Sequence, residues 1–414
     1  MKLLIINIGE IVGIVPEGVM RKQGAEMSET GVLKDAWLRI EDGLIKDFGP
    51  MADCPLADGE LLDAEGGMVM PAFCDSHTHV VYAGSREGEF LDKIDGLSYE
   101  EIAARGGGIL NSADLLHRTP EDELYEQSMV RVREMMAAGS GAIEIKSGYG
   151  LNPEDELKML RVIRRIRQSV PAVIRSTFLG AHAVGRGYTH ESYVDTVVGM
   201  MPRAAELADF GDVFCDEGFF TPEDAVRIMK AGAACGLPAK IHADELAESG
   251  GVEAGARCGA LSVDHLERSG PAQVEALRGT QTMPTMLPGS SFFLGIPFAP
   301  AKQFIESGLG IALASDYNPG SSPSGDMRFV MALGCIRMRL TPIQAFNAVT
   351  LNSAYAMGVA HLAGSVTPGK IANLIVTDPG WNLTKIPYLH HTPFIRIVIL
   401  RGRSIFGEGL KPVF

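Results

Sequence analysis

The stretch PAFCDSHTHVVYAG, which spans Pro71–Gly84, decides how the rest of the chain is interpreted. It begins as an apolar run typical of a buried strand and ends in Asp-Ser-His-Thr-His. Side chains alternate between the two faces of a strand, so His77 and His79 would point the same way. Two imidazoles at a strand end can bind a metal ion, and they can equally be surface residues where a strand meets a loop. The stretch alone leaves both interpretations open.

The composition is that of an acidic globular protein, with 414 residues, 46% of them hydrophobic, and a formal net charge of −14. A chain of this length exceeds one small core, so we expect a large domain and a smaller one. Binding of nucleic acid or of an anionic membrane requires basic surface, which this charge disfavours. A small anionic substrate is not excluded, because one local arginine can bind it.

The N-terminal stretch and the cysteines indicate where the protein works. Residues 1–16 lack a signal-peptide pattern, and no run approaches the roughly 20 apolar residues of a membrane span. The six cysteines are scattered without a Cys-x-x-Cys pair, which is typical of free thiols in a reducing compartment. We therefore expect a cytoplasmic protein that binds neither nucleic acid nor membrane.

The middle of the chain alternates between short apolar runs and helix-like stretches. One such stretch, residues 120–139, carries an apolar stripe at helical spacing and an acidic first turn. Eight strand-like runs separated by helices predict a (β/α)₈ (TIM) barrel, and an open doubly wound sheet is the main alternative. The runs are Ala72–Asp75, Ala142–Lys146, Val173–Leu179, Asp212–Asp216, Ala239–His242, Leu261–Asp264, Gln281–Thr285 and Gly310–Ser315.

The two ends of the chain share a different texture of short strands broken by glycine and acidic turns. We therefore predict a small β-sandwich domain built from both termini, residues 1–69 and 364–414. The barrel is predicted to occupy residues 70–363 between them.

Nearly every predicted barrel strand ends in a side chain that can bind a metal or transfer a proton. Barrel enzymes place their catalytic groups at these strand ends. Each side chain has an ordinary structural explanation by itself, but a shared position at one barrel face predicts a common site. The residues are His77, His79, Tyr149, His182, His242, Glu245, His265, Asp316 and Asn318. For the remaining histidines we expect no catalytic role: His117, His190, His361, His390 and His391.

These motifs resemble the amidohydrolase superfamily of metal-dependent barrel hydrolases. The resemblance lies in DSHTH after the first strand, histidines after the fifth and sixth, aspartate after the eighth, and the later TPIQAFNAVTLNSAYAMGV and GSVTPGKIANLIVTD. More narrowly, HTHVVYAGSREGEF, EIKSGYGL, FLGAHAV, IHADEL, VDHLE, LPGSSFFL and SDYNPGSSPS resemble the imidazolonepropionase family. The resemblance covers nearly the whole chain.

The resemblance implies a metal site with His77, His79, His242 and Asp316 as ligands. Three imidazoles and a carboxylate suit Zn²⁺ or Fe²⁺, and we expect one divalent ion. Many relatives hold two metals bridged by a carboxylated lysine after the fourth strand, but the fourth strand here, DVFCDEGF, has no lysine. Lys146 ends the second strand, and we interpret it as structural or substrate-facing.

The resemblance also implies the substrate 4-imidazolone-5-propanoate, whose ring opening by water gives N-formimidoyl-L-glutamate. Hydrolysis of a cyclic amide requires an oxyanion stabiliser, a base for the water and an acid for the leaving nitrogen. These roles fall to Glu245, His265 and Asp316, and their division stays open. Arg86 is expected to bind the propionate carboxylate. Further substrate contacts are expected from Tyr149, His182, Glu245, Asn318, Gly320 and Ser321.

Two other functions stay possible at this point. The same barrel and metal could open another cyclic amide or deaminate a heterocycle, although neutral bases have less need of Arg86. A catalytically silent binding barrel fits poorly, because all the proposed ligands and acid–base residues are present. From the family we also expect a homodimer.

Overall fold

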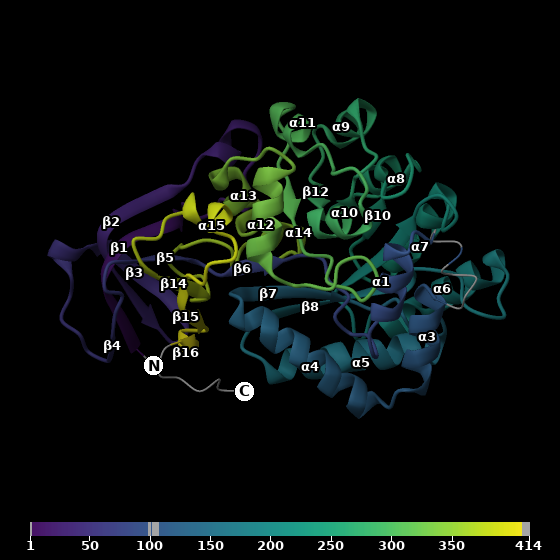
Figure 1. The fold of residues 1–414 in the computed structure, drawn as a ribbon, viewed down its shortest axis with the longest axis horizontal. Helices are drawn as coiled ribbons and strands as arrows, with labels where there is room; N and C mark the ends of the chain where they lie inside the picture. Colours follow the sequence, from purple (N-terminus) through teal and green to yellow (C-terminus); the bar gives the residue numbers. More distant parts are fainter. Residues whose placement is uncertain (1, 98–100, 102–106, 408–414) are drawn as a thin grey trace.

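The computed structural model describes residues 2–97, 101 and 107–407. Figure 1 shows a β-rich part formed by both ends of the chain and a larger part in which strands and helices alternate. The strands are β1 (Lys2–Ile14), β2 (Gly31–Glu41), β3 (Leu44–Pro50), β4 (Glu60–Asp63), β5 (Gly67–Pro71), β6 (Phe73–Asp75), β7 (Ser140–Lys146), β8 (Val173–Ala181), β9 (Phe210–Cys215), β10 (Lys240–Ala243), β11 (Ser262–His265), β12 (Met283–Met286), β13 (Ala312–Leu313), β14 (Leu374–Pro379), β15 (Ile395–Leu400) and β16 (Arg403–Gly407).

Strands β6 to β13 form a parallel sheet in which each strand pairs with the next along the chain. The two edges of this sheet meet beyond the strand ends. The backbone N–H of His79 donates to the carbonyl of Tyr317 (2.9 Å), and that of Asp316 donates to the carbonyl of His77 (3.0 Å). The predicted barrel is therefore confirmed, each of the eight predicted runs overlaps one of its strands, and the open-sheet alternative is wrong.

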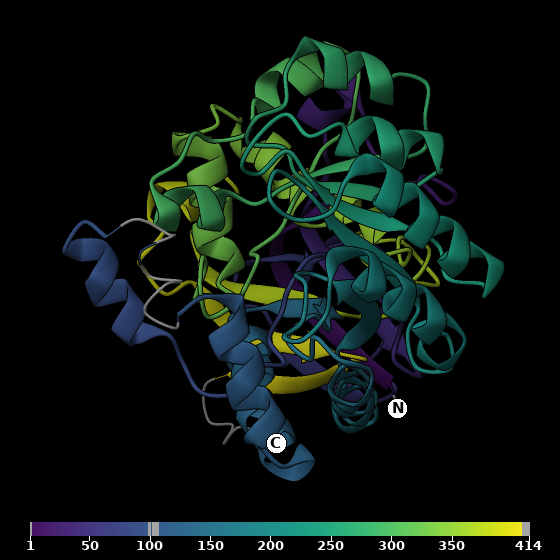
Figure 2. The same cartoon turned by 90° about the vertical axis from the view of Figure 1, so that its right-hand side faces the viewer.

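Helices lie around the outside of the barrel strands, as Figure 2 shows. Within the described residues, no helix combines the length and the apolar composition that a membrane span requires. The helices are α1 (Glu87–Ile94), α3 (Ile109–Arg118), α4 (Glu121–Ala137), α5 (Pro153–Ser169), α6 (His190–Ala204), α7 (Pro222–Ala234), α8 (Gly251–Arg257), α9 (Pro271–Leu277), α10 (Pro288–Leu294), α11 (Ala301–Glu306), α12 (Met327–Ile336), α13 (Pro342–Ala348), α14 (Leu351–Ala356) and α15 (Lys385–Tyr388), with 3₁₀ turns η1 (Gly24–Ser28) and η2 (Met51–Asp53).

The long helices α4 and α5 show why these sequences are helical. In α4 the predicted stripe is buried, including Leu124, Val132 and Met136, and three acidic residues occupy the first turn, where the helix dipole favours them. Helix α5 begins with Asn152, whose side chain accepts from the N–H groups of Glu154 and Asp155, followed by proline at the first helical position. Both helices pack their apolar faces on the barrel core.

The other sheet is built from both ends of the chain, as predicted. Strands β1 to β5 and β14 to β16 form one mixed sheet in the order β16-β15-β14-β5-β1-β2-β3, with β4 on β1. Aliphatic side chains of this sheet form an apolar core, which includes Ile5, Leu38, Val376 and Ile399. The domain boundaries at residues 69 and 364 stay a prediction, and residues 408–414 of the predicted domain lie outside the described part.

The opening stretch is the connection between the two sheets. Strand β5 ends at Pro71 in the terminal sheet, and β6 begins at Phe73 in the barrel. Between them, the N–H of Ala72 donates to the carbonyl of Asn373, while that of Phe73 donates to the carbonyl of Gly139 (2.9 Å each). The chain therefore changes sheets within three residues, which brings His77 and His79 to the end of the first barrel strand.

Candidate active site and metal centre

Three imidazoles and one carboxylate converge at the carboxyl ends of β6, β10 and β13. The Nε2 atom of His79 lies 3.3 Å from Nε2 of His77 and 3.5 Å from Nε2 of His242. Oδ1 of Asp316 lies 3.7 Å and 3.6 Å from Nε2 of His77 and His79. All four residues are buried. The structure thus brings together the four residues that the sequence predicts as metal ligands.

Carboxylates beneath the cluster determine which ring nitrogens carry hydrogen. Nδ1 of His77 lies 2.7 Å from Oδ2 of Asp264, and Nδ1 of His242 lies 3.2 Å from Oδ1 of Asp212. A carboxylate only accepts, so the hydrogen is assigned to Nδ1 and each Nε2 presents a lone pair. The same assignment turns the lone pair of His77 toward the Asp316 carboxylate, whose Oδ1 lies 3.7 Å away.

This arrangement suits a cation. The Nε2 lone pair of His77 faces Oδ1 of Asp316 across 3.7 Å, and the Nε2 lone pair of His242 lies 3.5 Å from Nε2 of His79. Burial lowers the pKa of His77 and His79 well below the ordinary value, which keeps both imidazoles neutral and able to bind metal. The donor set of imidazole nitrogen and carboxylate oxygen fits a transition-metal ion such as Zn²⁺ or Fe²⁺.

His265 and Glu245 lie beside the ligands. Nε2 of His265 is 3.7 Å from Oε2 of Glu245, and its Nδ1 is 3.5 Å from Oε2 of Glu267. Burial lowers the pKa of His265, but the two glutamates outweigh it and raise that pKa overall. Burial also raises the pKa of Glu245, so this pair retains a proton at neutral pH. His265 further forms a second possible ligand group with His77 and Asp316, whose donor atoms lie within 4.8 Å of one another.

The backbone at two of these strand ends is in a conformation that L-residues rarely adopt. The φ angles are +88° at His265, +71° at Leu266 and +54° at Asp316. Such conformations cost roughly 1–3 kcal/mol each and concentrate at functional sites. His265 and Asp316, whose side chains both belong to the cluster, therefore lie where the strands end in this rare conformation.

Two of the predicted substrate-binding residues lie beside His79. The His182 ring stacks on the His79 ring at 5.2 Å, and the Tyr149 ring lies 6.0 Å from His79 and 5.4 Å from His182. Burial lowers the pKa of His182 to about 3, and its Nδ1 lies 3.0 Å from the carbonyl of Gly148. A neutral imidazole and a phenol therefore form one wall next to the proposed ligands.

Arg86 lies immediately before α1 and contacts the loop that follows β13. Its Nε donates to Oε2 of Glu89 at 2.9 Å. Its guanidinium also approaches Gly320 so closely that a Cβ there would overlap it. The sequence interpretation missed Glu89, although its position three residues after Arg86 is a spacing at which side chains pair on a helix.

The loop after β13 links Arg86 to the ligand Asp316. Oδ1 of Asn318 accepts from the N–H groups of Gly320 and Ser321 (2.8 Å each). The hydroxyl of Ser321 donates to Oδ2 of Asp316 at 3.2 Å. These three loop residues were predicted as substrate contacts, and their hydrogen bonds hold the loop between the arginine and the ligand.

The carboxylates that orient the site were largely missed from the sequence. Asp264 and Asp212 support the ligands, and Asp216 accepts from the N–H groups of Glu245, Leu246 and Ala247 at 2.8 to 3.1 Å. One signal was visible, because charged residues inside otherwise apolar barrel strands must find partners in the interior. Asp75 lies in the same layer and accepts from Ser315 N–H (3.0 Å) and Oγ (2.5 Å).

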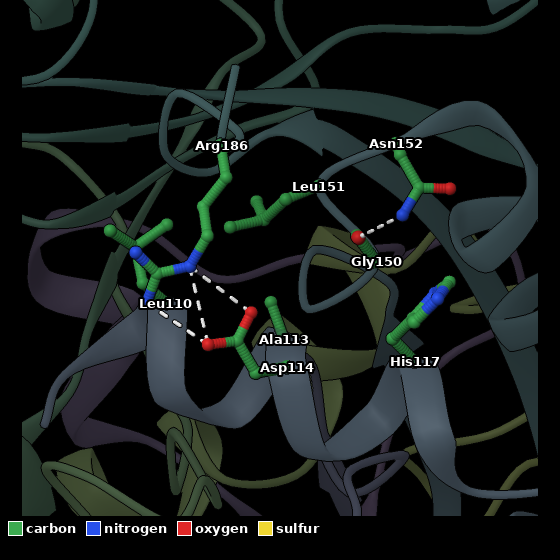
Figure 3. A pocket seen from close by; sticks show the side chains of 8 residues that line it. All are labelled: Leu110, Ala113, Asp114, His117, Gly150, Leu151, Asn152 and Arg186. Carbon is green, nitrogen blue, oxygen red and sulfur yellow. Dashed lines mark hydrogen bonds and ion pairs between the residues drawn. The ribbon is translucent and has the colours of Figure 1, made fainter. Parts of the chain in front are cut away.

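A separate pocket of about 290 Å³ opens beside the turn that follows Tyr149 (Figure 3). Polar groups in it already have partners: Arg186 points at Asp114, with Nη2 3.0 Å from Oδ2, and Asn152 points at the carbonyl of Gly150. His117 lines the same pocket and lies 2.6 Å from Asp155, outside both groups of possible ligands. This pocket lacks the convergent donors of the buried centre.

Known protein families and relatives agree with the geometry of the site. The model of the amidohydrolase family matches residues 68–405. The imidazolonepropionase of Flavobacterium johnsoniae is 50% identical to this chain over 97% of it and 99% of that protein. The imidazolonepropionase of Geobacillus kaustophilus is 41% identical over 93% of each.

Solved structures with much lower identity share the fold. A zinc-bound adenosine deaminase from Xanthomonas campestris matches with a TM-score of 0.73 at 16% identity, covering 98% of this chain and 93% of that one. A 5-methylcytosine deaminase from Klebsiella pneumoniae matches with a TM-score of 0.73 at 16% identity, covering 98% and 99%. The chain belongs to the amidohydrolase family and, within it, to the imidazolonepropionases.

Proposed function

We propose that this chain hydrolyses 4-imidazolone-5-propanoate to N-formimidoyl-L-glutamate. The observation that carries the proposal is the buried convergence of His77, His79, His242 and Asp316 beside the proton-holding pair Glu245–His265. Membership of the imidazolonepropionases supports the choice of substrate. In the reaction water adds to the ring carbonyl, the carbonyl–nitrogen bond breaks, and the leaving nitrogen takes a proton.

One divalent ion, Zn²⁺ or Fe²⁺, would be held by the three histidines and Asp316. When bound, it supplies a Lewis acid that polarises the ring carbonyl and lowers the pKa of the attacking water. Asp212 and Asp264 accept from Nδ1 of His242 and His77, so the Nε2 lone pairs of these histidines are free to bind the ion. This supports the ligand set.

The surrounding residues would move the protons and stabilise the developing charge. His265, kept protonated by its two glutamates, is placed to stabilise the oxyanion that forms from the carbonyl. Asp316 can accept a proton from water, and Glu245 can deliver one to the ring nitrogen. Burial raises the pKa of Glu245 to about 7, which supports proton exchange at this carboxyl near neutral pH.

Arg86 would bind the propionate carboxylate. A guanidinium can donate two parallel hydrogen bonds to a carboxylate. The hydrogen bond from Arg86 Nε to Glu89 fixes the orientation of this guanidinium. Tyr149 and His182 would contact the ring, with Asn318, Gly320 and Ser321 shaping the opposite side. The contact between Arg86 and Gly320 supports a tail site next to this loop.

The proposal extends to a cytoplasmic homodimer that binds neither nucleic acid nor membrane. The six free cysteines and the net charge of −14 support the compartment and the absence of nucleic-acid binding. The dimer rests on family resemblance alone, and sedimentation at several protein concentrations tests it.

The decisive experiment presents freshly prepared imidazolone propionate to metal-loaded protein and to protein stripped by a chelator. We expect the metal-loaded protein to cause a loss of imidazolone absorbance. This activity should vanish when the metal is stripped and return with one equivalent of Zn²⁺ or Fe²⁺. Deamination of a purine or pyrimidine without turnover of the imidazolone would contradict the proposal.

A further inference from the structure

Beneath the proposed ligands lies a cluster of charged residues that the mechanism does not use. Its members sit on the barrel strands β7, β9, β10 and β11, and their side chains are buried to 0–1% exposure. They are Glu144, Lys146, Asp212, Lys240 and Asp264. Isolated buried charges are very costly, so each must be paired, and the pattern of pairing carries information.

Lys146 is the member that connects both halves of the ligand set. Its Nζ lies 2.7 Å from Oδ2 of Asp212 and 3.6 Å from Oδ2 of Asp264. Those two aspartates are the same ones that accept from His242 and His77. One ammonium therefore bridges the two carboxylates that orient ligands from strands more than 160 residues apart in sequence.

Lys240 is chemically similar and equally buried, but its contacts differ. It pairs with Glu144 and donates to the carbonyls of Ser76 (3.2 Å) and Ala356 (3.1 Å). Both lysines share Glu144, which lies 2.8 Å from Lys146. Lys146 alone of these two is paired with the aspartates behind the histidines.

We infer that Lys146 is a positioning residue for the metal site, which holds Asp212 and Asp264 so that His242 and His77 present Nε2 together. This inference rests on the proposed metal site and adds the residue that aligns its two halves. Without the ammonium, two like charges would face each other across the barrel interior and separate, and each imidazole would follow its carboxylate. The charge count fits this role, because three carboxylates against two ammoniums leave one negative charge beneath the cation.

The same contacts argue against a bridging, carboxylated Lys146. Carboxylation requires the neutral amine, whereas Lys146 is surrounded by three carboxylates. Although burial lowers the pKa of Lys146, those carboxylates outweigh it and raise the pKa above the ordinary value. The side chain remains an ammonium that donates to fixed acceptors.

The experiment compares Lys146→Met with Lys240→Met in the full chain. Each variant removes one buried ammonium, and both should lower the free energy of unfolding. Zinc affinity is measured by competition with a chromophoric chelator, and ligand geometry by the visible absorption of the Co²⁺-loaded protein. Removing a group that orients metal ligands typically weakens metal binding about 10–100-fold. We expect that loss and an altered Co²⁺ spectrum for Lys146→Met, and a change below about threefold with the wild-type spectrum for Lys240→Met.

Equal loss of affinity in the two variants, or an unaltered Co²⁺ spectrum in Lys146→Met, would overturn the inference while the proposed function stands. A wild-type protein that binds no metal would overturn both. If Lys146→Met does not fold, ¹⁵N NMR of the metal-free wild type still tests the inference, because it shows which ring nitrogen of each histidine carries hydrogen. Nδ1–H forms of His77 and His242 are required, and hydrogen on Nε2 of either overturns the inference.

Discussion

The two sheets of this protein treat their interiors in opposite ways. The terminal sheet is filled by aliphatic residues such as Ile5 and Ile399, whereas the barrel encloses ion pairs around Lys146. Aliphatic burial stabilises a fold at roughly 25 cal/mol per Å², while buried ion pairs are often no better than apolar residues of the same size. The barrel interior therefore holds ion pairs in place of apolar side chains. We infer that these pairs orient the site, whereas apolar packing in the terminal sheet contributes mainly to stability.

Two buried lysines show the same difference at single-residue scale. Burial lowers the pKa of Lys146, but its carboxylate partners outweigh it and raise that pKa overall. Lys370, at the edge of the terminal sheet, donates to the uncharged Ser365 hydroxyl (2.7 Å) and Ala363 carbonyl (3.4 Å), and burial lowers its pKa to about 8. A partner of opposite charge, rather than burial alone, decides whether a buried lysine is strongly held as an ammonium.

The largest effect is expected from a proposed ligand in the barrel. His242→Ala should reduce turnover of the imidazolone at least about 10³-fold, because metal activation of carbonyl and water is worth several kcal/mol. Bound metal should fall below one per chain, as measured by atomic emission, with little change in circular dichroism. Unchanged turnover in this variant would contradict the ligand assignment.

The matching change in the terminal sheet should affect stability and spare chemistry. Ile399→Ala removes a fully buried side chain of β15 and should cost about 2–5 kcal/mol in urea unfolding. Turnover per folded molecule should stay at the wild-type level. Val32→Ala on β2, where the side chain is 46% exposed, is the control and should change stability by no more than about 0.5 kcal/mol. A loss of turnover in folded Ile399→Ala would show that the terminal sheet also contributes to the chemistry.

A smaller effect is expected at the mouth of the barrel. Arg86→Met should raise KM for the imidazolone acid about 10–100-fold, since hydrogen bonds to charged groups contribute roughly 1.5–3 kcal/mol. An analogue without the carboxylate serves as the control, because its KM should be the same for both proteins. Equal losses for acid and analogue would show that Arg86 supports the fold of the loop rather than the substrate tail.

A pH effect sharpens the comparison of the two lysines. The pKa of Lys370 is about 8 in the folded chain against an ordinary value of 10.5, so the unfolded chain binds more protons between these values. Stability from this group therefore rises with pH across that window. The stability gained by Lys370→Met over wild type should be greatest below pH 8 and shrink toward pH 10.5, as followed by urea unfolding. A gain independent of pH would refute the assignment.

Much of the fold could be predicted because its signals are local. Strand runs such as Val173–Leu179 and the helical stripe of residues 120–139 depend on periodicity within one element. His77 and His79 share a face by strand alternation, and the placement of polar groups at strand ends then follows from the barrel itself. The orienting contacts could not be predicted in this way. Asp264 is 187 residues from His77, so no local pattern marks the two as partners.

The sequence by itself determined the barrel, the terminal β domain and the residue types that meet at the strand ends. Each depends on the order of apolar and polar residues along one strand or helix, which the chain carries without reference to its other parts. Only the tertiary structure decided which nitrogen of His77 and His242 faces the cluster, and that Lys146 joins the aspartates behind them. These outcomes depend on distances and charges between strands far apart in sequence, where a shift of 1 Å makes or breaks a hydrogen bond.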